Sequence, residues 1–381
     1  MRDVIAHVVR RTEARFARDD GWPMHRRDID GGDDAPAWPL YHGACGVIWA
    51  LTHLAASGAA MLARDYGDFV ASLVPRNRTW LRSFGCTFDA SYAMGETGIL
   101  LLEHGLNGTP ATADRLAALI ASNFDNPTRE LMWGSPGTML AALFLHERTG
   151  EERFATLFRA TARTLRSQLE WSDEHACHYF TQDMYGQRST YLDAVHGFVA
   201  TASPLIRGRY LLEPGEWSSW HDCIENTVRR TATREGTLVN WPVFLDVPRG
   251  RPATLLMQFC HGAPGFVVCL ADMPGTGLDD LLVGGAEAAW HAGPLAKGPN
   301  LCHGTAGNGY ALLKLFGRTG ERRWLERARA FAMHAIAQME AEERHVGELR
   351  YSLWTGDPGV AVYLLDCIRG GARFPTLDVF D

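Results

Sequence analysis

The chain has 381 residues, of which 46% are apolar and 21% charged, and its formal net charge is −7 at pH 7. This composition is typical of a globular domain with its own core, and the acidic balance disfavours nucleic acids and anionic membranes as partners. No apolar run reaches the roughly 18 residues that a membrane-spanning helix needs, and no secretory signal pattern opens the chain. The sequence therefore favours a cytoplasmic protein, in which its eight cysteines stay reduced.

Amphipathic stretches recur along the chain and predict helices with one solvent-exposed face, because their apolar residues fall at i, i+3, i+4 and i+7. In chain order they occupy residues 4–17, 63–74, 113–124, 152–170, 220–232, 278–290 and 322–340. The stretch at 63–74 has the least clear periodicity. Short extended pieces such as 178–183 are expected to form small hairpins, and no β-domain is predicted.

A glycine motif, Gly-x-x-Gly, recurs between these stretches. It reads HGACG, MGETG, WGSPG, HGAPG, HGTAG and TGDPG, and a weaker copy, HGFVA, has Ala200 in place of the last glycine. The leading glycines are Gly43, Gly95, Gly134, Gly197, Gly262, Gly304 and Gly356. Each copy precedes an apolar run with helical periodicity. Glycine suits a tight entry into such a helix because it tolerates positive φ and the close approach of another backbone. We term each copy a glycine corner.

Seven units follow from this pattern, each made of an amphipathic helix, a glycine corner and a more apolar helix. Their spacing of 39 to 65 residues is in the range of helical hairpins. Apolar helices bury all their sides when such a series closes into a ring. The sequence therefore predicts an all-α fold, an α/α toroid of seven inner and seven outer helices, formed by residues 1–381 as a single domain. The corners would gather at one end of the ring and build a site there.

Two consecutive corners carry the longer motif Cys-His-Gly-x-x-Gly, at Cys260 and at Cys302. Thiolate and imidazole are zinc ligands, and three protein ligands with an open fourth position form a catalytic site. Because neighbouring corners would lie side by side, we expect Cys260 and Cys302 to share a zinc ion. The spacing does not decide between His261 and His303 as the third ligand. The alternative is that the His-Gly pair only shapes the corner, as it does at His42 without a cysteine.

Four further residues are candidates for the site. His196 heads its own corner and suits proton transfer near neutral pH, with a hydrogen-bonded turn histidine as the alternative. Glu130, four residues before Gly134, can supply a carboxylate or is a solvated loop acid. Lys297 can hold a carboxylate of a ligand or is a solvated loop charge. Tyr310 can line the open end of the ring or belongs to the core, where aromatic residues more often lie.

The motifs CHGAPG at Cys260, LCHGTAGNGY around Cys302 and HGFVA at His196 resemble those of the LanC-like family, the lanthionine cyclases and their eukaryotic relatives. The likeness spans essentially the whole chain through the seven corners. The family fold is an α/α toroid of seven inner and seven outer helices. The Cys-His-Gly at Cys260 is more similar to the LanC-like proteins than to the lantibiotic cyclases, which commonly have Cys-Tyr-Gly there.

The resemblance assigns roles to these residues. The zinc ligands of the family fall on Cys260, Cys302 and His303, which leaves His261 beside the metal as a further catalytic candidate. The catalytic histidine of the family falls on His196.

Three other positions bear on the resemblance. An acid of some cyclases, often Asp, falls on Glu130. Leu256 stands where cyclases carry a basic residue, so that part of their site has no match. LanC-like proteins have a lysine close to the position of Lys297, and in them that lysine is associated with glutathione binding.

The resemblance implies a reaction. A substrate thiol at the fourth zinc position would lose its proton and add to the β-carbon of dehydroalanine or dehydrobutyrine, and His196 would protonate the α-carbon. We therefore expect a zinc-dependent, lanthionine-forming cyclase that acts on a dehydrated precursor peptide. A separate dehydratase or kinase-like enzyme would supply that peptide.

Other functions stay open. Glutathione or another free thiol can be the nucleophile in place of a peptide cysteine, or the chain is a zinc-stabilised scaffold that binds a peptide or partner without catalysis. A carbohydrate-active toroid ranks last, because it needs facing carboxylates and the corners offer only Glu96, Glu130 and Asp357.

Overall fold

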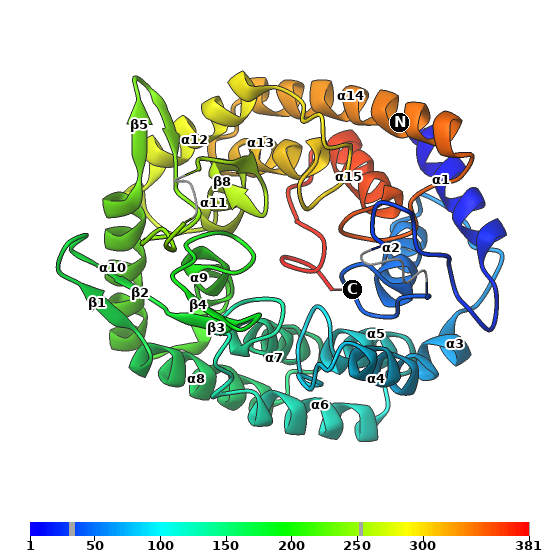
Figure 1. Ribbon diagram of the computed structural model, residues 1–381, viewed down its shortest axis with the longest axis horizontal. Helices are drawn as coiled ribbons and strands as arrows, with labels where there is room; N and C mark the ends of the chain where they lie inside the picture. Colours follow the sequence, from blue (N-terminus) through cyan, green and yellow to red (C-terminus); the bar gives the residue numbers. More distant parts are fainter. Residues whose placement is uncertain (30–34, 251–253, 381) are drawn as a thin grey trace.

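Two concentric rings of helices form the molecule (Figure 1). The structure, a computed structural model, describes residues 1–29, 35–250 and 254–380. The chain runs around the ring, so that α1 (Arg2–Arg15) at the start lies beside α15 (Asp357–Arg369) near the end. None of the described helices combines the length and the apolar character needed to cross a bilayer. The predicted α/α toroid is confirmed.

The inner ring consists of the helices that follow the glycine corners. They are α2 (Ala44–Ala56), α5 (Glu96–Asn107), α7 (Ser135–Thr149), α9 (Phe198–Arg207), α11 (Ala263–Leu270), α13 (Thr305–Thr319) and α15. Each begins directly after its leading glycine. Helix α7 is buried without interruption from Ser135 to Leu145. A helix that is apolar on all sides belongs in the interior, which is why these segments form the inner ring.

The outer ring consists of the amphipathic helices. Besides α1, they are α3 (Gly67–Ala71), α4 (Leu73–Ser83), α6 (Pro110–Ser122), α8 (Glu152–Ser167), α10 (Pro214–Thr231), α12 (Asp279–Ala292) and α14 (Arg322–Val346). The prediction of one helix over 63–74 is wrong, because the chain forms α3 and α4 there and α4 continues to Ser83. Pro75 has no N–H to bond the carbonyl of Ala71, so a continuous helix cannot pass this point.

The described part of the chain also forms four small antiparallel hairpins between the helices. They pair β1 (Glu170–Ser172) with β2 (Cys177–Tyr179), β3 (Gln182–Met184) with β4 (Gln187–Ser189), β5 (Thr233–Glu235) with β6 (Leu238–Asn240), and β7 (Met257–Gln258) with β8 (His261–Gly262). One 3₁₀ turn, η1 (Arg209–Leu211), follows α9. The extended piece at 178–183 is therefore divided between two hairpins.

Backbone hydrogen bonds join the corners at the position two residues before each leading glycine. The N–H of Tyr41 donates to Ala93 O, Ala93 to Met132, Cys260 to Cys302, Cys302 to Trp354 and Trp354 to Tyr41, with N–O distances of 2.9–3.1 Å. The N–H of Leu131 donates to Val195 O in the same circle. These bonds fix neighbouring corners side by side and place Cys260 directly beside Cys302.

In the six corners that have a last glycine, close packing leaves no room for a side chain there. A Cβ atom at Gly307 would lie 1.9 Å from the carbonyl oxygen of Leu301, and one at Gly265 would lie 2.0 Å from that of Phe259. Of the seven leading glycines, only Gly262 has positive φ, at +106°. The predicted close approach is confirmed, while positive φ is needed at that one leading position.

The C-terminal segment fills the middle of the ring after α15 (Figure 1). Phe374 is fully buried, and its ring centroid lies 4.4 Å from that of Phe259. Phe380 packs against Phe144 at 5.6 Å, and Arg148 donates a hydrogen bond to its carbonyl. The sequence pattern gave no sign of this plug, because its apolar residues have neither helical nor strand periodicity.

Candidate metal centre and acid–base site

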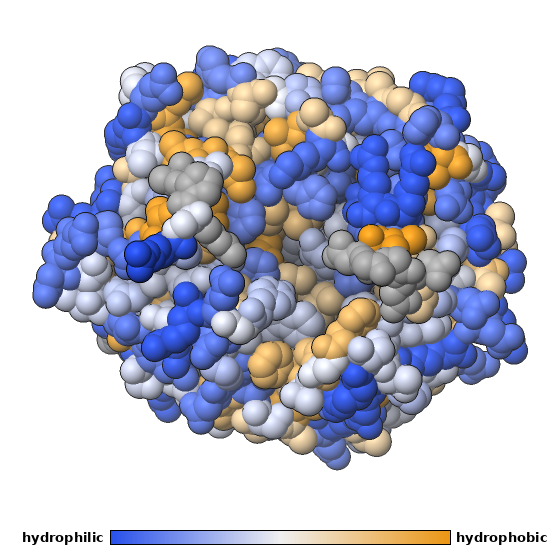
Figure 2. Space-filling model, viewed as in Figure 1, coloured by the Kyte–Doolittle hydropathy of each residue, from blue (hydrophilic) through white to orange (hydrophobic). Residues whose placement is uncertain are grey.

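The glycine corners meet at one end of the ring around a cavity of about 650 Å³. Its lining includes His196, Cys260, His261, Lys297, Cys302 and His303. The face that contains this end is hollowed near its centre (Figure 2). Six of the candidate residues named from the sequence therefore share one cavity, although they span 108 positions from His196 to His303 in the chain.

Two cysteine thiols lie next to each other in this cavity. Cys260 and Cys302 are 7% and 4% exposed, and their side chains are hydrogen bonded. The contact with Cys260 lowers the pKa of Cys302 well below that of an ordinary thiol, and His303 and Tyr41 act in the same direction against the effect of burial. The hydrogen bond with Cys302, then burial, and then the charge of Cys302 raise the pKa of Cys260 well above that of an ordinary thiol. The pair thus offers a thiolate and a second sulfur to a cation.

His303 contacts Cys302 but does not complete a three-ligand cluster in this conformation. The backbone N–H of His303 donates to Asn300 Oδ1 at 3.0 Å, which holds the backbone of the corner in place. In the part of the chain that the structure describes, the donor atoms of Cys260, Cys302 and His303 are not all within 4.8 Å of one another. Two sulfurs and one imidazole suit zinc by their chemistry, and the imidazole has to move closer for the three to share an ion.

A separate group of metal-type side chains lies at the surface. Glu174, His175 and Asp246 have donor atoms within 4.8 Å of one another, and both acids are exposed. His175, in the turn between β1 and β2, has its Nε2 3.2 Å from Asp246 Oδ1, and this hydrogen-bond contact brings the two side chains together. None of these three residues lines the site cavity.

Glu130 and His196 form a buried carboxylate–histidine pair. Glu130 is fully buried, and its Oε2 accepts from the N–H of Met132 at 2.9 Å and lies 3.0 Å from His196 Nδ1. Burial lowers the pKa of His196, but the hydrogen bond and the charge of Glu130, with the charge of Asp193, raise it above the ordinary value overall. With Nδ1 held by the acid, Nε2 is the nitrogen that can exchange a proton with a molecule in the cavity.

A second pair, Asp193 with His261, was missed in the sequence. Asp193 is fully buried, and its Oδ2 lies 2.7 Å from His261 Nδ1. Its Oδ1 accepts from the N–H groups of Val195 at 3.0 Å and His196 at 2.7 Å. The same carboxylate therefore shapes one corner and orients the histidine of the next.

The two pairs share one design. Glu130 and Asp193 each lie four residues before the leading glycine of their own corner, and each holds the histidine that directly precedes the next leading glycine. This offset is the signal that could have found Asp193, because Glu130 had been singled out by the same spacing. The ring centroids of His196 and His261 are 6.4 Å apart, so both histidines face the same cavity.

Gln258 and Tyr41 are two further residues that the sequence reading missed. Lys297 Nζ donates to Gln258 Oε1 at 2.7 Å, and Gln258 Nε2 donates to Cys260 Sγ at 3.0 Å, which links the lysine to the thiol pair. Tyr41 OH donates to Cys302 Sγ at 2.9 Å. Burial first, and then the charge of Cys302, raise the pKa of Tyr41 well above its usual range, so it remains a donor. Tyr41 stands two residues before the leading glycine of its corner, the same position that Cys260 and Cys302 occupy in theirs.

Tyr310 lies away from the cavity. Its side chain is fully buried, donates to Asp366 Oδ2 at 2.7 Å and packs against Phe374 at 4.8 Å. This placement corresponds to the core alternative and gives no support to a substrate-binding role. Leu256, in place of the cyclase basic residue, lines a neighbouring apolar cavity with His261.

Comparisons with known proteins agree with the fold and the corners. Residues 34–379 match the family model described as lanthionine synthetase C-like protein. The chain is 27% identical over 266 residues to glutathione S-transferase LANCL1 of Danio rerio, which covers 66% of this chain and 62% of that protein. It is 30% identical over 142 residues to LanC-like protein GCL1 of Arabidopsis thaliana, which covers 34% and 32% of the two chains. The matches thus span less than two thirds of either relative.

A solved structure extends the likeness to the whole molecule. Nisin cyclase superposes with a TM-score of 0.65 at 15% identity and covers 98% of both chains. At this identity the match shows a shared fold, and the family model covers residues 34–379, a range that includes all seven corners. The chain therefore belongs to the lanthionine synthetase C-like family.

Proposed function

We propose that the protein is a zinc-dependent enzyme that adds a cysteine thiol to a dehydroalanine or dehydrobutyrine residue of a peptide and so forms a lanthionine or methyllanthionine thioether. One observation carries the proposal. His196, which the buried Glu130 holds at Nδ1, lines the same cavity as the adjacent thiols of Cys260 and Cys302. A proton donor thus faces a cation site that suits sulfur ligands.

Cys260, Cys302 and His303 are the residues that would hold the metal. Zinc, when bound, keeps a substrate thiol deprotonated while it remains nucleophilic. Tyr41 and Gln258 donate to the two sulfurs, at 2.9 and 3.0 Å, and so fix the orientation of both ligands. Such outer hydrogen bonds tune the ligands of a metal site.

His196 would supply the proton. The substrate sulfur forms a bond to the β-carbon, the electron pair of the carbon–carbon double bond moves to the α-carbon and its carbonyl, and His196 Nε2 delivers a proton to the α-carbon. The histidine then recovers a proton equal to the one lost by the thiol, so the addition is balanced without a redox partner. Glu130 stabilises the imidazolium that this role requires. His261, held by Asp193, lies close enough to assist at the same substrate.

Glutathione is the second candidate nucleophile. The relative from Danio rerio is named a glutathione S-transferase, and the exposed Lys297 stands at the rim of the cavity, where a thiol ligand with carboxylates can pair with it. The nucleophile then comes from outside the peptide, and the addition is intermolecular. In both reactions a separate dehydratase or kinase-like enzyme provides the dehydroamino acid.

The test uses one dehydrated peptide that contains a cysteine, incubated with the purified protein with and without glutathione. Cyclisation leaves the mass unchanged and removes the free thiol, whereas glutathione addition increases the mass by one glutathione. His196→Asn is expected to abolish either product, while His334→Asn, at an exposed histidine of α14, keeps it. If the peptide binds but neither product forms, the protein is a binding scaffold without catalysis and the proposal fails.

A further inference from the structure

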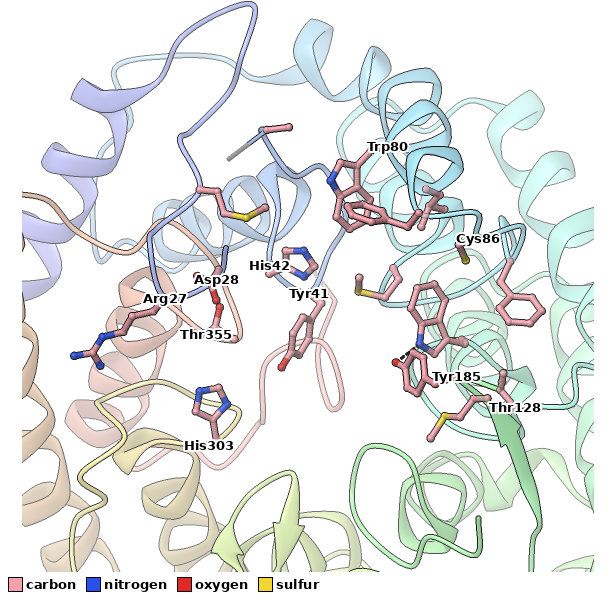
Figure 3. A pocket seen from close by; sticks show the side chains of 18 of the residues that line it. Arg27, Asp28, Tyr41, His42, Trp80, Cys86, Thr128, Tyr185, His303 and Thr355 are labelled. Carbon is pink, nitrogen blue, oxygen red and sulfur yellow. Dashed lines mark hydrogen bonds between the residues drawn. The ribbon is translucent and has the colours of Figure 1, made fainter. Parts of the chain in front are cut away.

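A cavity of about 720 Å³ opens directly beside the candidate metal centre. Tyr41 and His303 line both cavities, as do Arg27 and Arg350. Figure 3 shows His303, Arg27 and Asp28 at one side of this space, Trp80, Cys86 and Tyr185 at the other, and Tyr41 and His42 between them. A molecule whose reacting atom lies at the thiol pair can therefore extend into this adjoining cavity.

Aromatic side chains form the far wall of the second cavity, which we term the aromatic cavity. They are Trp80, Phe84, Phe88, Trp133 and Tyr185. The rings form contacts from Trp80 to Phe84 at 4.9 Å, from Phe88 to Trp133 at 6.3 Å and from Trp133 to Tyr185 at 6.5 Å. They come from α4, from the approach to α5, from the third corner and from the turn between β3 and β4. The wall is thus assembled from segments distant in sequence.

Several of these rings are unusually exposed for apolar groups. Phe84 is 57% exposed, Tyr185 is 68% exposed and Phe88 is 36% exposed. Tyr185 also has a positive φ of 54°, which is costly for a residue with a large side chain. Its hydroxyl accepts a hydrogen bond from Trp133 Nε1 at 2.8 Å, so the exposed ring is held over the cavity. Exposed, clustered aromatics that are fixed in place mark a binding surface.

The charges of this cavity are already paired. Arg350 Nε donates to Asp28 Oδ2 at 2.7 Å, and Arg27 donates to Glu342 Oε2 at 2.7 Å. Each of the two arginines that line the cavity thus already has a carboxylate partner. An apolar wall beside paired charges favours an apolar group over a charged one.

We propose that the aromatic cavity binds a large apolar side chain, aromatic or aliphatic, of the substrate peptide next to the residue that reacts at the metal centre. This inference rests on the proposed function, because it takes the thiol pair as the place of reaction. The occupant is a peptide side chain because the cavity continues from the reaction site through Tyr41 and His303. It follows that the enzyme chooses dehydrated residues by an apolar neighbour.

The test measures binding apart from catalysis. Short labelled peptides carry alanine at the reactive position, so that they cannot react, and differ at one flanking residue, which is Phe, Leu, Ser or Asp. Fluorescence anisotropy gives the affinity of each peptide for the zinc-loaded protein. We expect the Phe and Leu peptides to bind about 10-fold more tightly than the Ser peptide, the order of magnitude for partial burial of a large side chain.

Variants then assign the preference to the aromatic cavity. Phe84→Ser and Tyr185→Ser change exposed rings, and we expect each to reduce the preference to about 3-fold or less, since part of the wall is lost. Tyr210→Ser is the matched control, because Tyr210 is 59% exposed and does not line this cavity. Equal affinity for the Phe and Ser peptides, or a preference that both wall variants retain, would overturn the proposal.

A second measurement on the unaltered protein guards against variants that misfold. A peptide with a benzophenone side chain at the flanking position is irradiated in the complex, and the crosslinked segment is identified by mass spectrometry. Crosslinks within residues 80–88, at Trp133 or at 184–185 support the proposal, and crosslinks confined to other segments contradict it. A protein that binds these peptides as expected but forms no thioether from a dehydrated peptide would refute the proposed function and leave the apolar site intact.

Discussion

Glu130 and Asp193 show how one buried carboxylate can perform two tasks. Each accepts backbone N–H groups of its own corner and also holds a histidine of the next corner. A buried anion is stable only when hydrogen bonds and a partner charge replace its lost hydration. The arrangement therefore fixes His196 and His261 in position and favours the protonated state of His196.

Replacing Glu130 by Gln is expected to move the pH dependence of the reaction. Burial alone lowers the pKa of His196, and Glu130 provides the largest opposing effect. Without the acid, the pKa of His196 falls. Because the proton donor is active when protonated, activity is lost as pH rises through this pKa, so the alkaline limb of the pH–rate profile moves to lower pH. At neutral pH we expect a loss of about 10²-fold.

The pH–rate profile of Glu130→Asp is the control, because this variant keeps the charge. An alkaline limb of Glu130→Gln at the pH of the unaltered protein would show that Glu130 does not act through His196.

Replacing Asp193 separates its two tasks. In Asp193→Asn, one oxygen can still accept from the N–H groups of Val195 and His196, but the acceptor for His261 is lost. We expect a lower kcat with a small change in Tm. In Asp193→Ala the corner N–H groups are unpaired as well, and each costs about 1–3 kcal/mol.

Steady-state kinetics and thermal unfolding of both variants test this division. Equal kcat for Asp193→Asn and the unaltered protein would show that the pair with His261 plays no part in the reaction.

At the scale of elements, the glycine corner is the unit that builds the site. It brings the end of one segment under the start of an inner helix, with no room for a side chain at its last glycine. The residue two positions before the leading glycine hydrogen bonds to the neighbouring corner through its backbone. This residue is Cys260 in one corner and Cys302 in the next.

Gly307→Ala is therefore expected to be strongly destabilising, because the new Cβ would lie 1.9 Å from the carbonyl oxygen of Leu301. We expect a cost above the usual range for overpacking, which is about 1–3 kcal/mol. Gly215→Ala is the matched control, since Gly215 lies in α10 with nothing within 4 Å of a new Cβ. Urea unfolding of both proteins measures the effect, and a Gly307→Ala protein as stable as the control would contradict the packing account.

Much of the fold was predictable because each glycine corner is a short contiguous motif and this motif recurs along the sequence. The seven corners, the inner helices and the adjacency of Cys260 and Cys302 follow from that repeat. Long-range contacts were not predictable. The role of Asp193 depends on its contact with His261, which is 68 residues away in the sequence. Tyr310 points toward Asp366 because of how α13 packs on α15. Pro75 marks the break between α3 and α4 in the sequence itself, because it has no N–H to continue the helix.

At the scale of the whole molecule, the C-terminal plug completes the ring. Phe374 and Phe380 are 0% and 3% exposed and fill the space between inner helices. Phe374→Ala is expected to cost about 3–5 kcal/mol, as large-to-small changes in a core do. Met61→Ala is the control, because Met61 is 92% exposed. Calorimetry of both variants tests the plug, and equal Tm values would show that the ring is stable without it.

The claim that the corners build a zinc centre has a direct measurement, the metal content of the purified protein by mass spectrometry. The account predicts about one zinc per chain, its loss in Cys302→Ser, and its retention in Cys86→Ser, which changes a half-buried cysteine outside the thiol pair. A purified protein without zinc, or a Cys302→Ser protein that keeps a full equivalent, would contradict it.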